Sequence, residues 1–195
     1  MPAPVEDLVT WAQETAGTLL DVPEFRGRRW DHVQAVGAKA ALIAGALDRK
    51  DGELLIASAW LHDIGYAEPL RTTGFHPLDG ARYLARCHVD VRLVRLVANH
   101  SGAVAEAALR GLTTAMIDFP DQTGPVRDAL WACDMTTSPV GKPVSFDARL
   151  REIIDRYGKA HTVSQSIRSQ ADQIRGAIQR TTDFVSARGL TLQLG

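Results

Sequence analysis

Histidine and aspartate side chains recur along this chain inside otherwise apolar, helix-forming segments. They are His32, the adjacent pair His62-Asp63, His76, His100 and Asp134. Imidazole nitrogens and carboxylate oxygens are ligands that suit Fe, Mn, Co, Ni and Zn. Because a His-Asp pair alone is weak evidence, the prediction of a metal site depends on where these residues fall on their helices.

Helical periodicity places several of these side chains on a buried face. His100 continues the i, i+3, i+4, i+7 pattern of Leu93, Leu96 and Val97, and Asp134 falls on such a face too. A carboxylate turned toward a core costs free energy unless a cation meets it. No cation is close by in the sequence, so we expect a shared metal ion; a hydrogen-bonded histidine network is the alternative.

The composition favours one domain over residues 1–195, since a chain with 45% hydrophobic residues can bury a substantial core. The net charge is -1 and the charges are interleaved, which argues against a nucleic-acid partner. Cys87 and Cys133 follow neither a metal-binding nor a disulfide pattern and are expected to be reduced core residues. Without a leader-like segment or an apolar run of about 20 residues, we expect a cytoplasmic protein with no membrane partner.

Apolar residues repeat with helical spacing along almost the whole chain, and no alternating run predicts a strand. The sequence therefore predicts an all-α, single-domain bundle with the metal site between core helices. The expected helices cover residues 5–20, 32–47, 52 or 53 to 63, 76 onward, 90–100, 103–110, 125–135, 146–157 and 163–187. Ser145 and Gly158 cap the eighth of these. The last is expected to close the domain, with a homodimer interface as the alternative.

Helix-end signals also locate the ligands. Pro77 suits the first turn of a helix, where its missing N–H costs nothing, so His76 lies at a helix mouth. Gly65 is expected to end the preceding helix and to let His62 and Asp63 converge on one point. Loops are expected over residues 66–75 and 136–143.

The order His32, His62-Asp63, Asp134 resembles the HD-domain superfamily of metal-dependent phosphohydrolases, in which His, His-Asp and Asp lie on separate helices. The resemblance covers roughly residues 29–157, through the segments RRWDHVQAVGAKA, ASAWLHDIGY, GFHPLDGARYL, LVANHSGA and ALWACDMTTSP. His76 and His100 resemble the branches with two metal ions, which include diadenosine-tetraphosphate hydrolases and cyclic-dinucleotide phosphodiesterases.

This resemblance implies one or two divalent transition-metal ions, with Fe or Mn favoured over Co, Ni or Zn. The first ion would be held by His32, His62, Asp63 and Asp134. Asp63 would bridge to a second ion held by His76 and His100; in a one-metal site these two histidines would instead bind substrate or pack. Two ions and two aspartates leave a net +2, which attracts phosphate. A metal-bound hydroxide would attack phosphorus, with Asp63 and His62 as the predicted catalytic residues.

The expected substrate is a small phosphorylated metabolite, with nucleotides as the favoured class. Arg71 and Lys142 lie in loops beside predicted ligands and are candidates for phosphate contacts, although surface cations are an equal alternative. Many hydrolytic members of the superfamily read His-Asp-x-Gly-Lys, whereas Tyr66 stands at the lysine position here. A lysine-dependent role is therefore in doubt, and Tyr66 is expected to cover the substrate site or to pack.

Two other functions stay open. Diiron oxygenases such as inositol oxygenase, and phosphonate-cleaving enzymes, resemble the same six-ligand pattern and require iron and dioxygen. A non-catalytic ligand-binding protein on an HD scaffold is the other alternative, which the complete ligand set disfavours.

Overall fold

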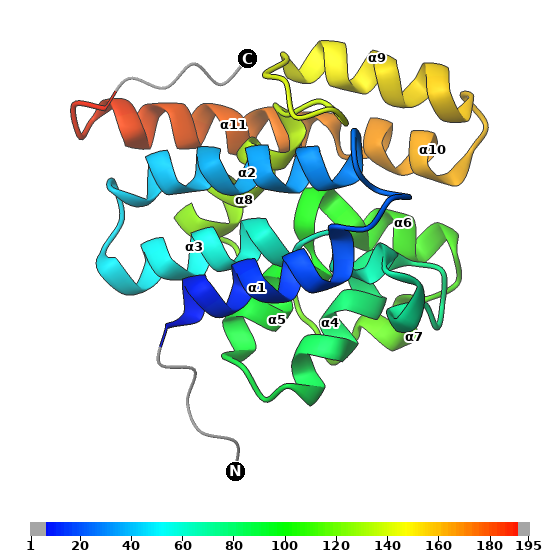
Figure 1. The fold of residues 1–195 in the computed structure, drawn as a ribbon. Helices are drawn as coiled ribbons and strands as arrows, with labels where there is room; N and C mark the ends of the chain where they lie inside the picture. Colours follow the sequence, from blue (N-terminus) through cyan, green and yellow to red (C-terminus); the bar gives the residue numbers. More distant parts are fainter. Residues whose placement is uncertain (1–6, 191–195) are drawn as a thin grey trace.

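Helices make up nearly all of the regular structure in residues 7–190, the part of the chain that the computed structural model describes (Figure 1). Within these residues the only pairing of extended segments is an isolated bridge between Thr137 and Pro143. The all-α prediction is confirmed. The predicted start of the first helix, at residue 5, lies outside the described residues.

The helices follow one another with short connections. In chain order they are α1 Leu8–Leu20, α2 Arg29–Ala44, α3 Arg49–Leu61, α4 His76–Arg86, α5 Val91–Ala98, α6 Ala103–Leu109, α7 Thr113–Met116, α8 Pro125–Met135, α9 Phe146–Tyr157, α10 Thr162–Ser169 and α11 Ala171–Ser186. Three 3-10 turns join them: η1 Ile64–Tyr66, η2 Glu68–Leu70 and η3 His100–Gly102. Among the described helices, none is both long and apolar enough to cross a membrane.

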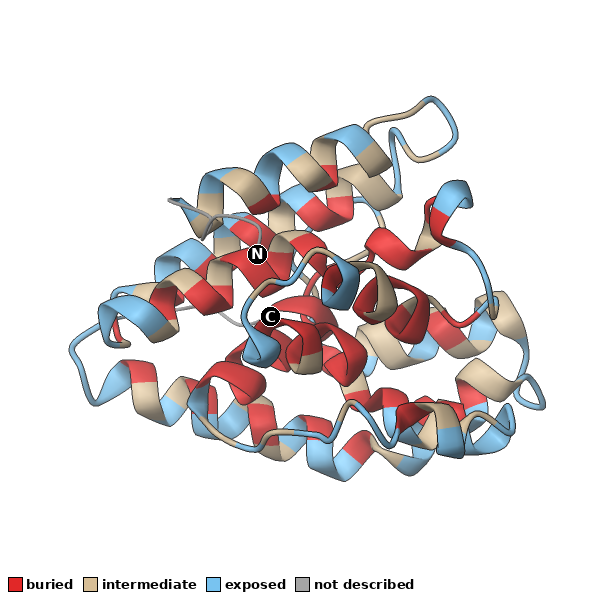
Figure 2. Ribbon diagram, turned by 90° about the horizontal axis from the view of Figure 1, so that it is seen from below, coloured by how far each residue is buried: buried red, intermediate tan, exposed pale blue. Residues whose placement is uncertain are grey.

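Helix α3 runs through the centre of the fold, where it packs against α1, α2, α5 and α8. Its buried residues, among them Leu55, Ala59 and Leu61, occupy more than one face, as expected for a helix that is surrounded by others. Figure 2 shows that the buried residues lie on the inward faces of the helices, while the outer turns and loops are exposed. The segment that follows α3, which begins with His62 and Asp63, therefore starts in the interior.

The predicted limits of α8 and α9 are confirmed, as is the start of α4. Helices α4 and α8 each have proline in the first two positions. Ser145 caps α9 by accepting a hydrogen bond from the amide of Ala148 at 3.3 Å, and α9 ends before Gly158 with φ of 83°. These are the elements whose ends are defined by local sequence signals.

The predicted single helix over residues 163–187 is wrong, because two helices, α10 and α11, meet at Gln170. No glycine or proline marks this break, and the apolar spacing continues through it. Helix α10 packs against α6 and α9, whereas α11 packs against α8. The three helices α9, α10 and α11 lie along one side of the molecule (Figure 1).

The expectation that Gly65 ends a helix is also wrong, since α3 stops at Leu61 and Gly65 lies within η1. Position 65 requires glycine because the backbone of η1 lies very close to the backbone of α4. A Cβ atom at this position would lie 2.0 Å from the carbonyl oxygen of His76 and 2.7 Å from the amide nitrogen of Gly80. Only a residue without a side chain lets η1 contact the backbone of α4, and this contact places Asp63 beside His76.

Candidate metal centre

The fold brings all six predicted ligands to one place. They come from the first turn of α2 (His32), the segment between α3 and η1 (His62, Asp63), the start of α4 (His76), η3 (His100) and α8 (Asp134). Five of the six are buried, and the His76 side chain is 18% exposed. Helical periodicity had therefore identified inward-facing polar groups correctly.

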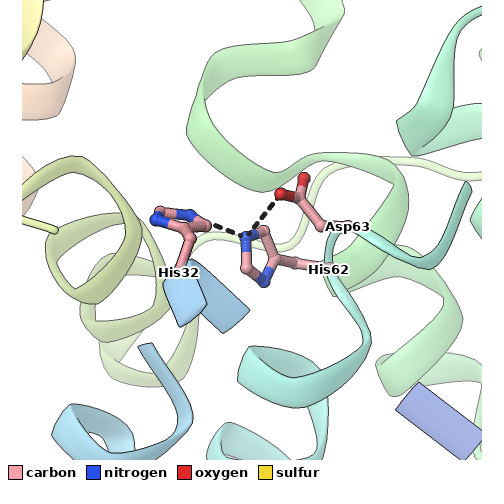
Figure 3. A group of neighbouring side chains, drawn as sticks. All are labelled: His32, His62 and Asp63. Carbon is pink, nitrogen blue, oxygen red and sulfur yellow. Dashed lines mark hydrogen bonds and ion pairs between the residues drawn. The ribbon is translucent and has the colours of Figure 1, made fainter. Parts of the chain in front are cut away.

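Asp63 lies at the centre of the cluster and belongs to two groups of three potential ligands. The first contains His32, His62 and Asp63, and the second contains Asp63, His76 and His100; within each group the ligand atoms lie within 4.8 Å of one another. Figure 3 shows His62 between His32 and Asp63. The distance from Asp63 Oδ2 to His62 Nε2 is 3.6 Å, and that from Oδ1 to His76 Nε2 is 3.3 Å. The two carboxylate oxygens thus face different groups.

Three of the histidine rings are oriented by the main chain. Each Nδ1 lies within hydrogen-bond distance of a carbonyl oxygen: Ser138 for His32 (3.0 Å), Ala59 for His62 (2.8 Å) and Val97 for His100 (2.7 Å). A carbonyl oxygen only accepts, so Nδ1 carries the proton and Nε2 of a neutral ring is left as an electron-pair donor. This is the arrangement of metal-binding histidines, whose other ring nitrogen donates to a fixed acceptor.

The Nε2 atoms of His32 and His62 face each other at 3.3 Å. When Nδ1 of a neutral ring donates to a carbonyl oxygen, its Nε2 has no proton to donate, so two such rings cannot form a hydrogen bond through these atoms. Nε2 of His32 also lies 3.0 Å from Oδ1 of Asp134. A cation that accepts electron pairs from all three groups satisfies the cluster, so the donor set fits a transition-metal ion.

Both aspartates are held ionised. Burial alone would raise the pKa of Asp63, but the guanidinium of Arg29 and the nearby His62 and His76 outweigh it and lower the pKa far below its ordinary value. Burial also opposes ionisation of Asp134, whereas the contact with the His32 ring and the nearby His62 and His100 outweigh it and hold its pKa well below the usual range. Two negative charges in a buried cluster complement the charge of a divalent cation.

His76 and His100, two of the potential ligands, have lowered pKa values that favour their neutral form. Burial lowers the pKa of His76 well below its ordinary value despite the attraction of Asp63, and burial together with His62 lowers the pKa of His100. Their Nε2 atoms are 3.1 Å apart. Tyr66 stacks on the His76 ring with a centroid separation of 4.0 Å, so it packs against a potential ligand, one of the two roles that the sequence suggested.

A buried carboxylate fixes the loop that precedes His76. Asp79 accepts hydrogen bonds from the hydroxyl of Thr72 (2.6 Å), the amide and hydroxyl of Thr73 (2.9 Å each) and the amide of Gly74 (3.1 Å). Because Asp79 is in the first turn of α4, these bonds fasten the incoming chain to the helix. They determine where His76 enters the site.

The loop over residues 136–143 supports the ring of His32. Lys39 donates to the carbonyl oxygen of Thr136 at 2.8 Å, at the end of α8. The main chain then turns so that Ser138 exchanges hydrogen bonds with Lys142, at 2.8 and 2.9 Å. This turn presents the Ser138 carbonyl to His32, so the predicted loop over residues 136–143 orients a ligand as well as contributing Pro139 to the cavity wall.

A cavity of about 120 Å³ adjoins the cluster. Tyr66 lines it, together with His32, Asp63, His76, His100 and Asp134. Arg71 and Lys142 are exposed, and neither is among the lining residues. Their contact with a substrate phosphate stays a prediction that the cavity geometry does not support.

Arg29 was not among the site residues predicted from the sequence. Its Nη1 donates to Oδ2 of Asp63, and its Cζ lies 3.3 Å from the centre of the Tyr66 ring. The signal was present, because residues three apart on a helix share a face and Arg29 is three residues before His32. Ser101 was also missed; its hydroxyl donates to Oδ2 of Asp134.

Comparison with known proteins identifies the family. The HD-domain family model matches residues 29–157, the range over which the sequence carries the His, His-Asp and Asp motifs. The chain therefore belongs to the HD-domain family, whose members are mostly metal-dependent phosphohydrolases. No curated protein and no solved structure matches the chain.

Proposed function

We propose that the protein is a metal-dependent phosphohydrolase that acts on a small phosphorylated metabolite. The observation that carries the proposal is the position of Asp63, which faces two groups of potential ligands beside an arginine-lined cavity. One or two bound divalent ions would supply a hydroxide near neutral pH and polarise the phosphate. Fe or Mn is the favoured metal, and the six ligands are those named above.

Arg29 is suited to bind the phosphate. One of its nitrogens pairs with Asp63, while stacking on Tyr66 holds the guanidinium plane in the cavity wall. A guanidinium has five N–H donors, so others remain for a phosphate oxygen. A fixed cation beside the reacting group stabilises the charge that develops in the transition state. We therefore assign the phosphate contact first to Arg29, while Arg71 and Lys142 stay the candidates predicted from the sequence.

A screen for phosphate release tests the proposal. We expect the Mn-loaded protein to hydrolyse a phosphate ester without dioxygen and to incorporate oxygen from labelled water into phosphate. The same six ligands favour one competing function, a diiron oxygenase. A strict requirement for iron and dioxygen, with label entering an organic product from the gas, would replace the hydrolase by the oxygenase.

Metal stoichiometry tests the two-ion arrangement. We expect a double variant, His76→Ala with His100→Ala, to bind one ion where the wild-type protein binds two, because the second group loses both imidazoles. His32→Ala should instead weaken the first site. The exposed His88 offers the matched control, His88→Ala, which should keep the wild-type metal content when measured by elemental analysis. An unchanged ratio in the double variant would return both histidines to substrate binding or packing.

A further inference from the structure

One face of α9 turns toward the cavity although it carries none of the potential metal ligands. Arg149, Ile153, Arg156 and Tyr157 line the cavity and follow the i, i+4, i+7, i+8 spacing of a single helix face. From α10, Val163 and Ile167 contribute apolar side chains to the same wall. The part of a substrate that is not bound at the metal ligands therefore meets α9.

The two arginines share one acid. Glu152 accepts from Nε of Arg156 at 2.8 Å and from Nη1 of Arg149 at 2.5 Å, so the three side chains carry a net charge of +1. Nε of Arg149 is buried and has no hydrogen-bond partner among the described residues. A buried donor without a partner costs free energy, and the N–H groups of both guanidiniums that do not pair with Glu152 remain donors for an anion in the cavity.

The cavity is small for a ligand site. Its volume of about 120 Å³ is below the roughly 300–1,000 Å³ that is typical of sites for drug-sized ligands. The part of a substrate that lies inside this cavity is therefore compact, with a short carbon body. The apolar side chains of Ile153, Val163 and Ile167 suit such a body.

We propose that Arg149 and Arg156 form a second anion site, and that the substrate is a compact phosphate ester with a second anionic group at its other end. The inference rests on the proposed hydrolase function, because it assigns the first phosphate to the metal ligands and Arg29. The second group is a carboxylate or a phosphate, either of which pairs with a guanidinium. This substrate class is smaller than a dinucleotide.

Binding of non-hydrolysable phosphonates tests the second site without requiring turnover. The probes are phosphonates with chains of two to four carbons that end in a carboxylate, in a second phosphonate or in a methyl group of matched length. We expect the Mn-loaded wild-type protein to bind at least one probe with an anionic end group about tenfold more tightly than the methyl-ended probe of matched length. This ratio corresponds to about 1.4 kcal/mol. The preferred end group distinguishes carboxylate from phosphate.

Variants of α9 assign that preference to the arginines. Arg149→Gln and Arg156→Gln should each reduce the tenfold preference while leaving affinity for the methyl-ended probe nearly unchanged. Arg151 is an exposed arginine of the same helix that does not line the cavity, so Arg151→Gln should retain the preference. Equal binding of charged and methyl-ended probes by the wild type, or a preference that survives both cavity substitutions, would overturn the inference.

A variant that increases the preference controls for misfolding, because a misfolded protein would only lose it. Glu152→Gln removes the negative charge that the two arginines share, so the preference for a probe with an anionic end group should increase. A decrease would contradict the proposed site. These measurements follow binding alone and do not depend on turnover. If the protein keeps the preference but releases no phosphate from any ester in the screen, the hydrolase function is rejected and the second anion site is retained.

Discussion

Asp63→Ala is expected to abolish metal-dependent phosphate release, with a loss of roughly two to three orders of magnitude or more, the scale seen when a preorganised charge-stabilising group is removed. Asp63 is the one residue shared by both groups of potential ligands, and it also holds Arg29. Its loss therefore removes metal affinity and phosphate positioning together. The rate of phosphate release and the metal content, measured on the same preparation, report both effects.

Two further variants separate the chemical effect from damage to the fold. Asp63→Asn keeps the shape of the side chain but removes its charge, so it should lose activity while circular dichroism stays helical. Asp155 is an exposed acid on α9, and Asp155→Ala should keep full activity. Near-normal phosphate release by either Asp63 variant would refute the proposed role of this carboxylate.

Gly65→Ala is expected to cost about 3 kcal/mol of unfolding free energy, at the upper end of the usual range for forced overpacking. The added methyl group would lie 2.0 Å from the carbonyl oxygen of His76, which is backbone and cannot rotate away. To relieve this clash, η1 and α4 must separate. Metal binding by the group that contains Asp63 and His76 should therefore weaken as well, and chemical denaturation with metal titration measures both quantities.

Gly45 provides the matched control for this substitution. It lies just after α2 with φ of -62°, and a Cβ atom there would meet nothing within 4 Å. Gly45→Ala should therefore leave stability unchanged or raise it slightly by restricting the unfolded chain. Equal stabilities of Gly65→Ala and Gly45→Ala would show that η1 does not depend on the close approach to α4.

The elements that could be predicted from the sequence are those whose ends carry local chemistry. Proline in the first turn located the start of α4, and the Ser145 and Gly158 caps located α9, because capping acts over a few residues. The break at Gln170 has no such signal. It is determined by contacts of α10 with α6 and α9 and of α11 with α8, which are distant in sequence.

The same division applies to the site. A buried ionisable residue interrupts an apolar pattern, so His100 and Asp134 could be recognised from spacing alone. For Arg29, the three-residue spacing from His32 indicated a shared helix face but not the pairing with Asp63. The role of Arg149 had no signal in the sequence, because most arginines lie on the surface. Arg71 and Lys142 illustrate the converse: proximity to a ligand along the chain did not place either side chain in the cavity.

The hydrogen bonds from three histidine rings to main-chain carbonyls make the ligand geometry tolerant of sequence change. The acceptors belong to Ala59, Val97 and Ser138, and every amino acid has a carbonyl group. Exchanging the side chains at these positions cannot delete the acceptor, as it would if an aspartate held each ring. Substitutions around the pocket can therefore alter substrate preference over evolutionary time while the imidazole rings keep their orientation.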